Sequence, residues 1–381
     1  MSEAVGEPPK LPSRRVIVPA LGLMQILAWG SSYYLLAVLA KPIASDTGWS
    51  LTWTVGALSC GMLISGFAGP GVGRAIDRWG GRPVLAASAP MFAAGLALLA
   101  LSPNLVVFFA GWIVLGVAMA AGLYDAAFST LGRIYGENAR QPITAVTLFG
   151  GLASTACWPL TAYLGETFGW RGACLIYAAM HLLIALPTYF AFLPNDGHRA
   201  PPAPVGPERV PPPSATFAIL ATAFAVTTAI TGVYSVHLLT FLQSRDIALP
   251  AAVALGTLVG PAQVTARVIE MFAGRYHHPI WTMAASSTFI ALGAALLWYG
   301  APFFAPALIL YGSGIGIQSI ARGTVPLALF GPGGYPVLMG RLAQPARIAG
   351  AASPIASAFM LESWGTDATL SALALLAATN L

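Results

Sequence analysis

The sequence predicts an all-α membrane protein in which twelve transmembrane helices form two pseudo-symmetric six-helix bundles. Three observations lead to this fold class. Hydrophobic residues make up 57% of the 381 residues and charged residues 8%, a composition outside the range of soluble globular proteins. Apolar segments of about 20 residues, the length that crosses a bilayer, recur along the chain. A charged segment at 73–82 returns in weaker form 193 positions later, at 266–275, which indicates an internal duplication.

The first half of the chain contains six apolar segments that can each span a hydrocarbon core of about 30 Å. They lie at 16–40, 51–72, 83–101, 105–134, 142–164 and 172–193. The following segment, 194–215, holds eight prolines among charged residues, a composition that favours an extended and solvated linker. We therefore predict a cytoplasmic tail at 1–15, an N-terminal bundle at 16–193 and a linker at 194–215.

The second half repeats this organisation and predicts a C-terminal bundle at 216–381. Its apolar segments lie at 216–242, 249–271, 279–299, 302–329, 342–362 and 366–381, and the last is the shortest. The run at 330–335 contains three glycines and a proline, so we expect a turn there between the tenth and eleventh helices. The many other glycines and prolines are compatible with membrane helices, because neighbouring helices satisfy the backbone groups that proline frees.

The basic residues predict the orientation in the membrane. With the N-terminus in the cytosol, only Lys41, Arg171 and Arg245 of the 18 basic residues lie outside; the other fifteen, Arg347 among them, lie at the cytoplasmic side. We expect a multi-pass protein of the cytoplasmic (inner) membrane with both termini cytoplasmic. This distribution also accounts for the net charge of +5. The sequence contains no basic patch with interleaved aromatic residues, so we do not expect nucleic acid as a partner.

The segment 73–82 carries a recognisable motif. Gly73, Asp77, Arg78, Gly80 and Arg82 resemble the loop signature between the second and third helices of the major facilitator superfamily (MFS), and the resemblance extends over nearly the whole chain. It implies the MFS fold, alternating access, and a signature whose charges hold the two halves together on the cytoplasmic side. The residues assigned to this cytoplasmic gate are Gly73, Arg74, Asp77, Arg78, Arg82, Arg267, Glu270 and Arg275.

The second copy of the motif allows two interpretations. Arg267 and Glu270 resemble the charged pair of monocarboxylate-type carriers, but they also align with Arg74 and Asp77. We favour a gate role because of this alignment. The Gly-Trp-Ser run at 48–50 and the aromatic-rich first helix are loosely similar to the oxalate/formate and monocarboxylate carrier branch of the family.

Two charges lie well inside predicted helices, where ionisable residues usually face a cavity or the bundle interior. Asp125 precedes the turn at Tyr135 by ten residues and Arg322 precedes Phe330 by eight, so both lie roughly 12–15 Å into the membrane. In the family that the chain resembles, the helices that carry them line the central cavity. Arg322, with Gln318 one turn away, would bind an anionic substrate, and Asp125 would carry a proton or compete with the substrate for the arginine. The alternative is a structural ion pair that closes the cytoplasmic side.

Mild polar stripes on the first and seventh helices are the remaining candidates. Thr231 and Tyr234 recur at helical spacing, which is typical of cavity lining and also of helix packing. His181 and the His277-His278 pair are expected to be a packing residue and a solvated loop. The predicted substrate or coupling residues are Asp125, Arg322, Gln318, Tyr124, Gln25, Tyr33, Tyr34, Thr231, Tyr234 and His237.

These features together predict a secondary active transporter that moves a small solute, preferably a small organic anion, by alternating access, with proton coupling as an option. The alternatives are an efflux pump for an apolar or cationic toxicant and a membrane sensor that does not transport. The sequence has no Walker loop that would indicate ATP-driven transport. We expect a monomer that binds a small molecule, without enzyme activity, cofactor, metal site or nucleic acid.

Overall fold

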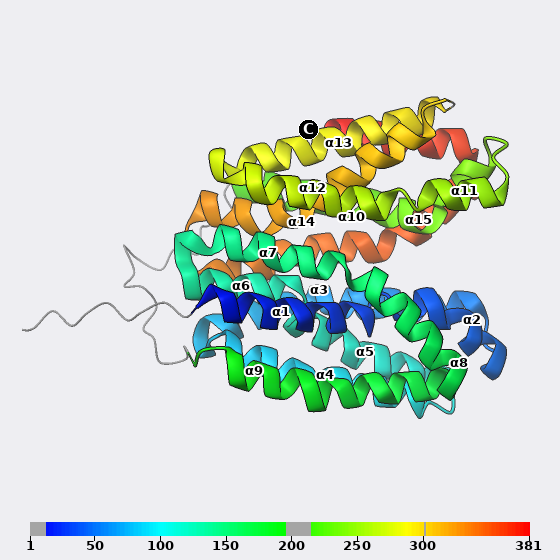
Figure 1. The fold of residues 1–381 in the computed structure, drawn as a ribbon. Helices are drawn as coiled ribbons and strands as arrows, with labels where there is room; N and C mark the ends of the chain where they lie inside the picture. Colours follow the sequence, from blue (N-terminus) through cyan, green and yellow to red (C-terminus); the bar gives the residue numbers. More distant parts are fainter. Residues whose placement is uncertain (1–12, 196–214, 301) are drawn as a thin grey trace, which may run out of the picture.

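The computed structural model describes residues 13–195, 215–300 and 302–381, and within these ranges it contains helices and no strand (Figure 1). The predicted tail at 1–15 and linker at 194–215 lie almost wholly outside the described residues, so the domain boundaries stay a prediction. Eight continuous helical segments in the described ranges are long and apolar enough to cross a bilayer. One of them, Leu105–Phe192, contains three crossings.

Six crossings make up the first bundle. Kinks divide some of them into shorter helices, and Gly169, with φ 71° and ψ 168°, divides α8 into parts of two crossings. The helices are α1 (Arg14–Gly30), α2 (Leu35–Thr47), α3 (Leu51–Trp79), α4 (Gly81–Ala100), α5 (Leu105–Gly122), α6 (Tyr124–Tyr135), the 3-10 turn η1 (Gly136–Ala139), α7 (Arg140–Gly151), α8 (Ala153–Met180), the π-helical turn η2 (His181–Ala185) and α9 (Leu186–Phe192).

Six further crossings make up the second bundle. Gly365, with φ 78°, divides α15 as Gly169 divides α8, 196 positions earlier. The helices are α10 (Ala215–Gln243), α11 (Leu249–Gly256), α12 (Val259–Ala273), the 3-10 turn η3 (Gly274–Tyr276), α13 (Pro279–Tyr299), α14 (Phe304–Phe330) and α15 (Tyr335–Thr379). The predicted twelve-helix arrangement is confirmed.

The predicted start of the eleventh crossing is wrong by seven residues. The eleventh crossing begins at Tyr335 and not at 342, because a turn of only four residues separates α14 from α15. Gly331 and Gly334 both adopt positive φ in this turn, which glycine does without a steric penalty, so the chain reverses within four residues. The extra helical turns of α15 place its basic residues deeper than the sequence suggested.

The two bundles lie side by side with their helices roughly parallel, α1 to α9 in one and α10 to α15 in the other (Figure 1). We name the end of the molecule where α3 turns into α4 the motif end, since it carries the segment 73–82. The beginning of α1, the end of α9 and the turn between α14 and α15 also lie at the motif end, on the left of Figure 1. The turn between α2 and α3 lies at the opposite end.

Close packing at the motif end joins the bundles. A Cβ atom on Gly73 of α3 would overlap the carbonyl oxygen of Pro336 on α15, and Gly69 faces Gly340 in the same way one turn further in. The fully buried Tyr335 packs against Gly132 and donates its hydroxyl to the Gly323 carbonyl at 2.5 Å. The apolar core of the first bundle therefore continues into the second bundle at this end.

Replacing Gly73 by alanine is expected to push α3 and α15 apart, because the added methyl group has no space beside Pro336. Spin labels at Arg78 and Arg341, both exposed at the motif end, should then show a larger share of long inter-bundle distances in pulsed electron resonance. Gly71→Ala is the matched control, since a Cβ there meets only Arg74 at 4.0 Å. An unchanged distance distribution in Gly73→Ala would contradict the packing described.

At the opposite end, ion pairs stay within one bundle. Arg171 pairs with Asp46, which also accepts the Trp170 indole N–H at 2.9 Å; all three belong to the first bundle. In the second bundle, Arg245 pairs with Asp367 at 2.6 Å. The corresponding hairpins of the two bundles thus carry opposite charges. No ion pair between described residues connects the bundles at this end.

Candidate functional site

A cluster of three buried charges bridges the bundles. Arg322 of α14 donates through Nε to Asp125 Oδ1 at 3.0 Å and through Nη2 to Oδ2 at 3.1 Å. Arg347 of α15 donates through Nη2 to the same Oδ2 at 3.3 Å. The side chains of Asp125, Arg322 and Arg347 are 13%, 20% and 7% exposed. One carboxylate of the first bundle is therefore shared by two arginines of the second.

The position of Asp125 follows from a break in the fourth crossing that the sequence did not predict. α5 ends at Gly122, Leu123 has an extended backbone with φ −87° and ψ −168°, and α6 begins at Tyr124. Gln25 of α1 donates to the Gly122 carbonyl at 2.7 Å and so satisfies one backbone group freed by the break. Asp125 thus lies in the first turn of α6, where the helix dipole favours a carboxylate.

Arg347 corrects the interpretation of the charges on the eleventh crossing. The sequence placed Arg347 at the cytoplasmic side, but it is 12 residues into α15, about 18 Å from the start of that helix. Its guanidinium carbon lies 6.0 Å from the ring centre of Trp29, on α1 of the first bundle. Its Nε has no hydrogen-bond partner among the described residues.

Arg267 of α12 is a second buried arginine with an unused donor. Its Nε donates to the Gly316 carbonyl at 3.0 Å and to Ser319 Oγ at 3.2 Å, and its Nη2 donates to Gln263. Nη1 is buried without a partner, and no described carboxylate lies within 4 Å of the guanidinium. Arg267 is only 5% exposed, so an uncompensated positive charge is held inside the protein.

Two successive glycines of α7 bring Arg267 close to the first bundle. A Cβ on Gly151 would overlap Arg267 Nη1, and a Cβ on Gly150 would overlap the Tyr124 hydroxyl. That hydroxyl donates to the Thr147 carbonyl, also on α7, at 3.4 Å. The unused Nη1 of Arg267 therefore lies near the residue that directly precedes Asp125.

Four aromatic side chains of the first bundle line the same region, and we name them the aromatic wall: Trp29, Tyr33, Tyr34 and Tyr124. The ring centre of Trp29 lies 5.5 Å from Tyr33, 6.1 Å from Tyr34 and 5.1 Å from Tyr124. Tyr33 and Tyr34 belong to the turn between α1 and α2, where the first crossing is interrupted. The members of the aromatic wall therefore lie in or next to two helix breaks, one at 31–34 and one at Leu123.

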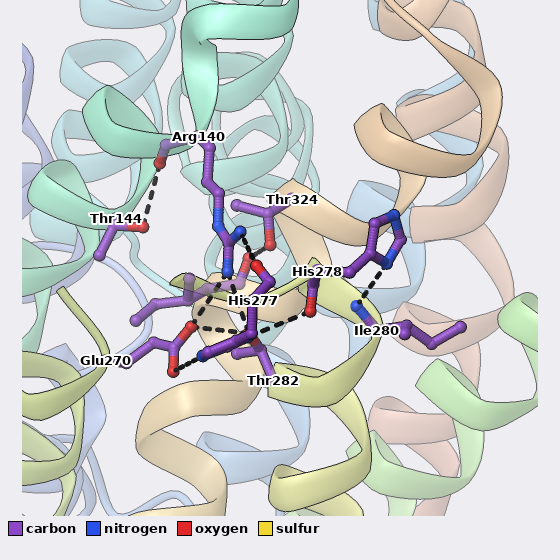
Figure 2. A network of polar contacts seen from close by, with 9 residues as sticks. Arg140, Thr144, Glu270, His277, His278, Ile280, Thr282 and Thr324 are labelled. Carbon is purple, nitrogen blue, oxygen red and sulfur yellow. Dashed lines mark hydrogen bonds and ion pairs between the residues drawn. The ribbon is translucent and has the colours of Figure 1, made fainter. Parts of the chain in front are cut away.

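Glu270 forms a second charged contact between the bundles, at the motif end (Figure 2). Its Oε1 accepts from Thr282 at 2.6 Å and from Arg140 Nη2 at 3.5 Å, and its Oε2 lies 3.5 Å from His277 Nε2. Arg140 Nη1 also donates to the His277 carbonyl at 2.5 Å. His277 lies in the loop before α13, as expected, and its side chain, which is 29% exposed, contacts Glu270.

The neighbouring His278 has a local role. Its Nδ1 accepts a hydrogen bond from the backbone N–H of Ile280 at 3.2 Å and so caps the N-terminus of α13 (Figure 2). This cap fixes the turn that presents His277 to Glu270. The sequence could have suggested the cap, since Pro279 at the start of a helix is a common N-terminal signal.

Glu270→Gln is expected to loosen this contact, because the neutral amide loses the charge that Arg140 pairs with. The backbone amides of 274–278 should exchange with deuterium at least about tenfold faster, corresponding to a loss of about 1.5 kcal/mol for a hydrogen bond to a charged group. Glu137→Gln is the matched control, since Glu137 is exposed. Equal exchange in both variants would show that Glu270 does not hold the bundles together.

Comparison with known proteins places this arrangement in a family. The sequence profile of the Major Facilitator Superfamily matches residues 21–354. The chain belongs to the major facilitator superfamily. Membership of this superfamily indicates a multi-pass membrane transporter, and the family resemblance predicted from the motif at 73–82 is confirmed.

Curated relatives match parts of this MFS chain. Monocarboxylate transporter 11 of Mus musculus is 31% identical over 140 residues, which cover 36% of this chain and 30% of the relative. The transcription regulatory protein OpdE of Pseudomonas aeruginosa is 32% identical over 182 residues, 45% of this chain and 43% of the relative. The aligned regions span less than half the length of these relatives.

Solved structures of MFS transporters share the fold over nearly the whole chain. The human organic anion transporter MFSD10 superposes with a TM-score of 0.77 at 18% identity, covering 97% of this chain and 99% of the other. The fucose:proton symporter FucP of E. coli gives 0.69 at 11% identity, covering 96% and 98%. The proton:xylose symporter XylE gives 0.72 at 12% identity, covering 96% and 94%.

The charged residues of the MFS signature contact mainly their own bundle. The carbonyl oxygen of Asp77 accepts from Arg133 at 2.6 Å, while its carboxylate forms no ion pair with a described residue. Gly73 is the signature residue that touches the second bundle closely. Arg74 is exposed, and three arginines lie over neighbouring rings: Arg78 over Trp79, Arg82 over Phe190 and Arg275 over Tyr276.

Several predicted substrate residues lie in the second bundle, away from the charge cluster. Gln318 accepts from Ser286 of α13 at 2.9 Å and so does not pair with Arg322. Thr231 donates to the Thr228 carbonyl at 3.0 Å. Tyr234 packs 4.9 Å from Tyr311, and neither its hydroxyl nor His237 Nε2 has a partner among the described residues. The described residues contain no group of three or more His, Cys, Asp or Glu that could hold a metal ion.

Proposed function

We propose that this transporter is a secondary active carrier of a small organic anion. The observation that supports this most strongly is the imbalance of charge between the bundles. The region contains three arginines, Arg267, Arg322 and Arg347. Among the described residues, Asp125 is the one carboxylate that lies within 4 Å of any of them, and it contacts Arg322 and Arg347. A buried positive charge without a counter-charge destabilises the folded protein by several kcal/mol, and a bound anion offsets this cost. The free donors, Arg267 Nη1 and Arg347 Nε, give that anion its hydrogen bonds.

The geometry divides the arginines into two roles. Arg322 makes a bidentate pair with Asp125, the strong form of the guanidinium–carboxylate contact, and so closes the bundles against each other. Arg347 contributes one contact to Asp125 at 3.3 Å and keeps Nε free, while Arg267 has no carboxylate partner among the described residues. We therefore assign anion binding to Arg267 and Arg347, and gating to the Arg322 pair. Substrate binding by Arg322 itself is the interpretation that this assignment replaces.

We propose that the motif end faces the cytosol, an orientation that the distribution of the basic residues supports. In this orientation the close packing at Gly73 and the contacts of Asp125 and Glu270 separate the arginines from the cytosol, in a conformation that loads from outside. Single cysteines at the exposed positions Ser45 and Tyr276, in a variant without native cysteines, would test the orientation. A membrane-impermeant maleimide should reach them from opposite sides, and labelling of both from one side would overturn the assignment.

The alternative of an efflux pump for cations is less compatible with the site. Asp125 would have to bind the cation, but both of its oxygens already accept from arginine. The name of the mouse relative, a monocarboxylate transporter, also agrees with an anionic substrate. A membrane sensor would bind the anion but would not move it across the membrane, so measuring net flux of the anion distinguishes a sensor from a carrier.

Uptake into proteoliposomes tests the proposal. We expect saturable uptake of at least one member of a panel of radiolabelled carboxylates, and an Arg267→Gln variant should reduce it at least tenfold. The same panel with an imposed pH gradient tests proton coupling through Asp125. Movement of hydrophobic cations without any carboxylate uptake would favour the efflux pump, and binding without uptake would favour the sensor.

A further inference from the structure

We infer that the anion carried by this protein has an aromatic ring, so that the substrate class is the aryl carboxylates. This inference rests on the proposed function and deepens it. The supporting observation is that the second bundle supplies two arginines with unused donors, Arg267 Nη1 and Arg347 Nε, while the first bundle supplies the aromatic wall beside them. The carboxylate of the ligand would bind to Arg267 and Arg347, and its ring would lie against Trp29 and Tyr124.

Three rings of the aromatic wall, Trp29, Tyr33 and Tyr124, pack against the core of the first bundle and also border the second bundle. Arg347 of α15 lies 6.0 Å from the Trp29 ring centre. Tyr33 is within hydrogen-bonding reach of Ser235 on α10. The Tyr124 hydroxyl lies against Gly150, next to the glycine that contacts Arg267 Nη1. The rings are therefore located where the two bundles meet, beside the unused donors of Arg267 and Arg347.

The burial of these rings differs from that of core aromatics in the same protein. Trp112, Tyr177 and Tyr335 are 0% exposed and completely enclosed by other side chains. All four members of the aromatic wall keep part of their surface accessible, and Trp158, which lies 6.3 Å from Tyr34, is 47% exposed. Rings that contact one another and keep part of their surface accessible are suited to receive a further ring.

The ring arrangement favours an aromatic ligand over an aliphatic one. Trp29 and Tyr33 meet edge to face at an interplanar angle of 75°, and Tyr33 and Tyr34 meet at 84°. Rings prefer such edge-to-face or offset contacts, which add a specific attraction to the burial of apolar area. From the usual size of this attraction we expect about fivefold tighter binding of an aromatic ring than of a saturated ring of equal size.

The experiment compares radiolabelled benzoate with radiolabelled cyclohexanecarboxylate, two anions of similar size that differ in aromaticity. Binding to the purified full-length protein is measured by scintillation proximity. We expect about fivefold tighter binding of benzoate to the wild type, and loss of this preference in Trp29→Leu. Trp29→Phe keeps a ring and should keep the preference. Trp281→Leu is the matched control, because Trp281 is 66% exposed on α13.

The outcomes separate the inference from the proposed function. Equal affinity for both anions in the wild type, with loss of both in Arg267→Gln, would overturn the aromatic preference and leave anion transport intact. An unchanged preference in Trp29→Leu would overturn the role of the aromatic wall. Should Trp29→Leu fail to fold, Tyr34→Leu provides the same comparison at the edge of the wall. Absence of binding for both anions, with no effect of Arg267→Gln on any uptake, would overturn the proposed function itself.

Discussion

Replacing Arg347 by glutamine is expected to reduce saturable carboxylate uptake to near background. Arg347 is buried and contributes a free Nε, so its loss removes a charge-assisted hydrogen bond as well as a positive charge. Loss of a buried charged contact typically costs 3–5 kcal/mol, which corresponds to a decrease in affinity of more than about a hundredfold. The bidentate pair of Arg322 with Asp125 should keep the variant folded.

Two further variants make this result specific. Arg347→Lys should restore little activity, because lysine keeps the charge but lacks the planar arrangement of donors. Arg341→Gln is the matched control, since Arg341 lies on the same helix but is exposed at the motif end. Uptake and equilibrium binding should both be measured. Binding of Arg347→Gln that equals the wild type would remove Arg347 from the substrate site.

The second large effect concerns Arg322 and its partner Asp125. Arg322→Gln should weaken anion binding about tenfold, although we do not assign Arg322 to the substrate. The reason is that Asp125, released from its bidentate partner, is free to pair fully with Arg347 and so competes with the anion. Asp125→Asn alone should lower stability by about 3–5 kcal/mol, since it leaves two buried arginines without a carboxylate.

The double variant Asp125→Asn with Arg322→Gln distinguishes the two roles that the sequence left open. If Arg322 acts only through Asp125, removing both charges should restore anion binding close to that of the wild type, a coupling typical of directly contacting residues. A substrate role of Arg322 predicts that the double variant stays inactive. Thermal unfolding and binding of all four proteins, measured in the same detergent, decide between these outcomes.

The fold was largely predictable because the thickness of the bilayer fixes the length of each apolar segment. The predicted 279–299 segment coincides with α13 (Pro279–Tyr299). The start of α15 was missed because the glycine-rich run at 330–335 suggested a longer turn than the one that forms. This error also hid Arg347, which a helix beginning at Tyr335 would have placed about 18 Å from the helix start.

The candidate site was predictable only in part. The expected matching depths of Asp125 and Arg322 agree with their direct contact. The separation of Arg267 from Glu270 was not predictable from the alignment with Arg74 and Asp77, because the second copy of the motif has a different backbone. Gly80 ends α3 with φ 87°, whereas the aligned Ala273 has φ −76° and is followed directly by η3. The break at Leu123 has no glycine or proline signal of its own at that residue, so hydropathy alone could not show it.

The charged residues that pair across the bundle interface differ between the two copies of the duplicated unit, which affects how each half could associate with a second copy of itself. Asp125 and Arg322 occupy nearly equivalent places in the two copies and pair across the bundle interface. A homodimer of either half would place like charges against each other at the bundle interface, where their repulsion is poorly screened. We therefore expect the two halves, when expressed separately, to associate with each other and not each with itself.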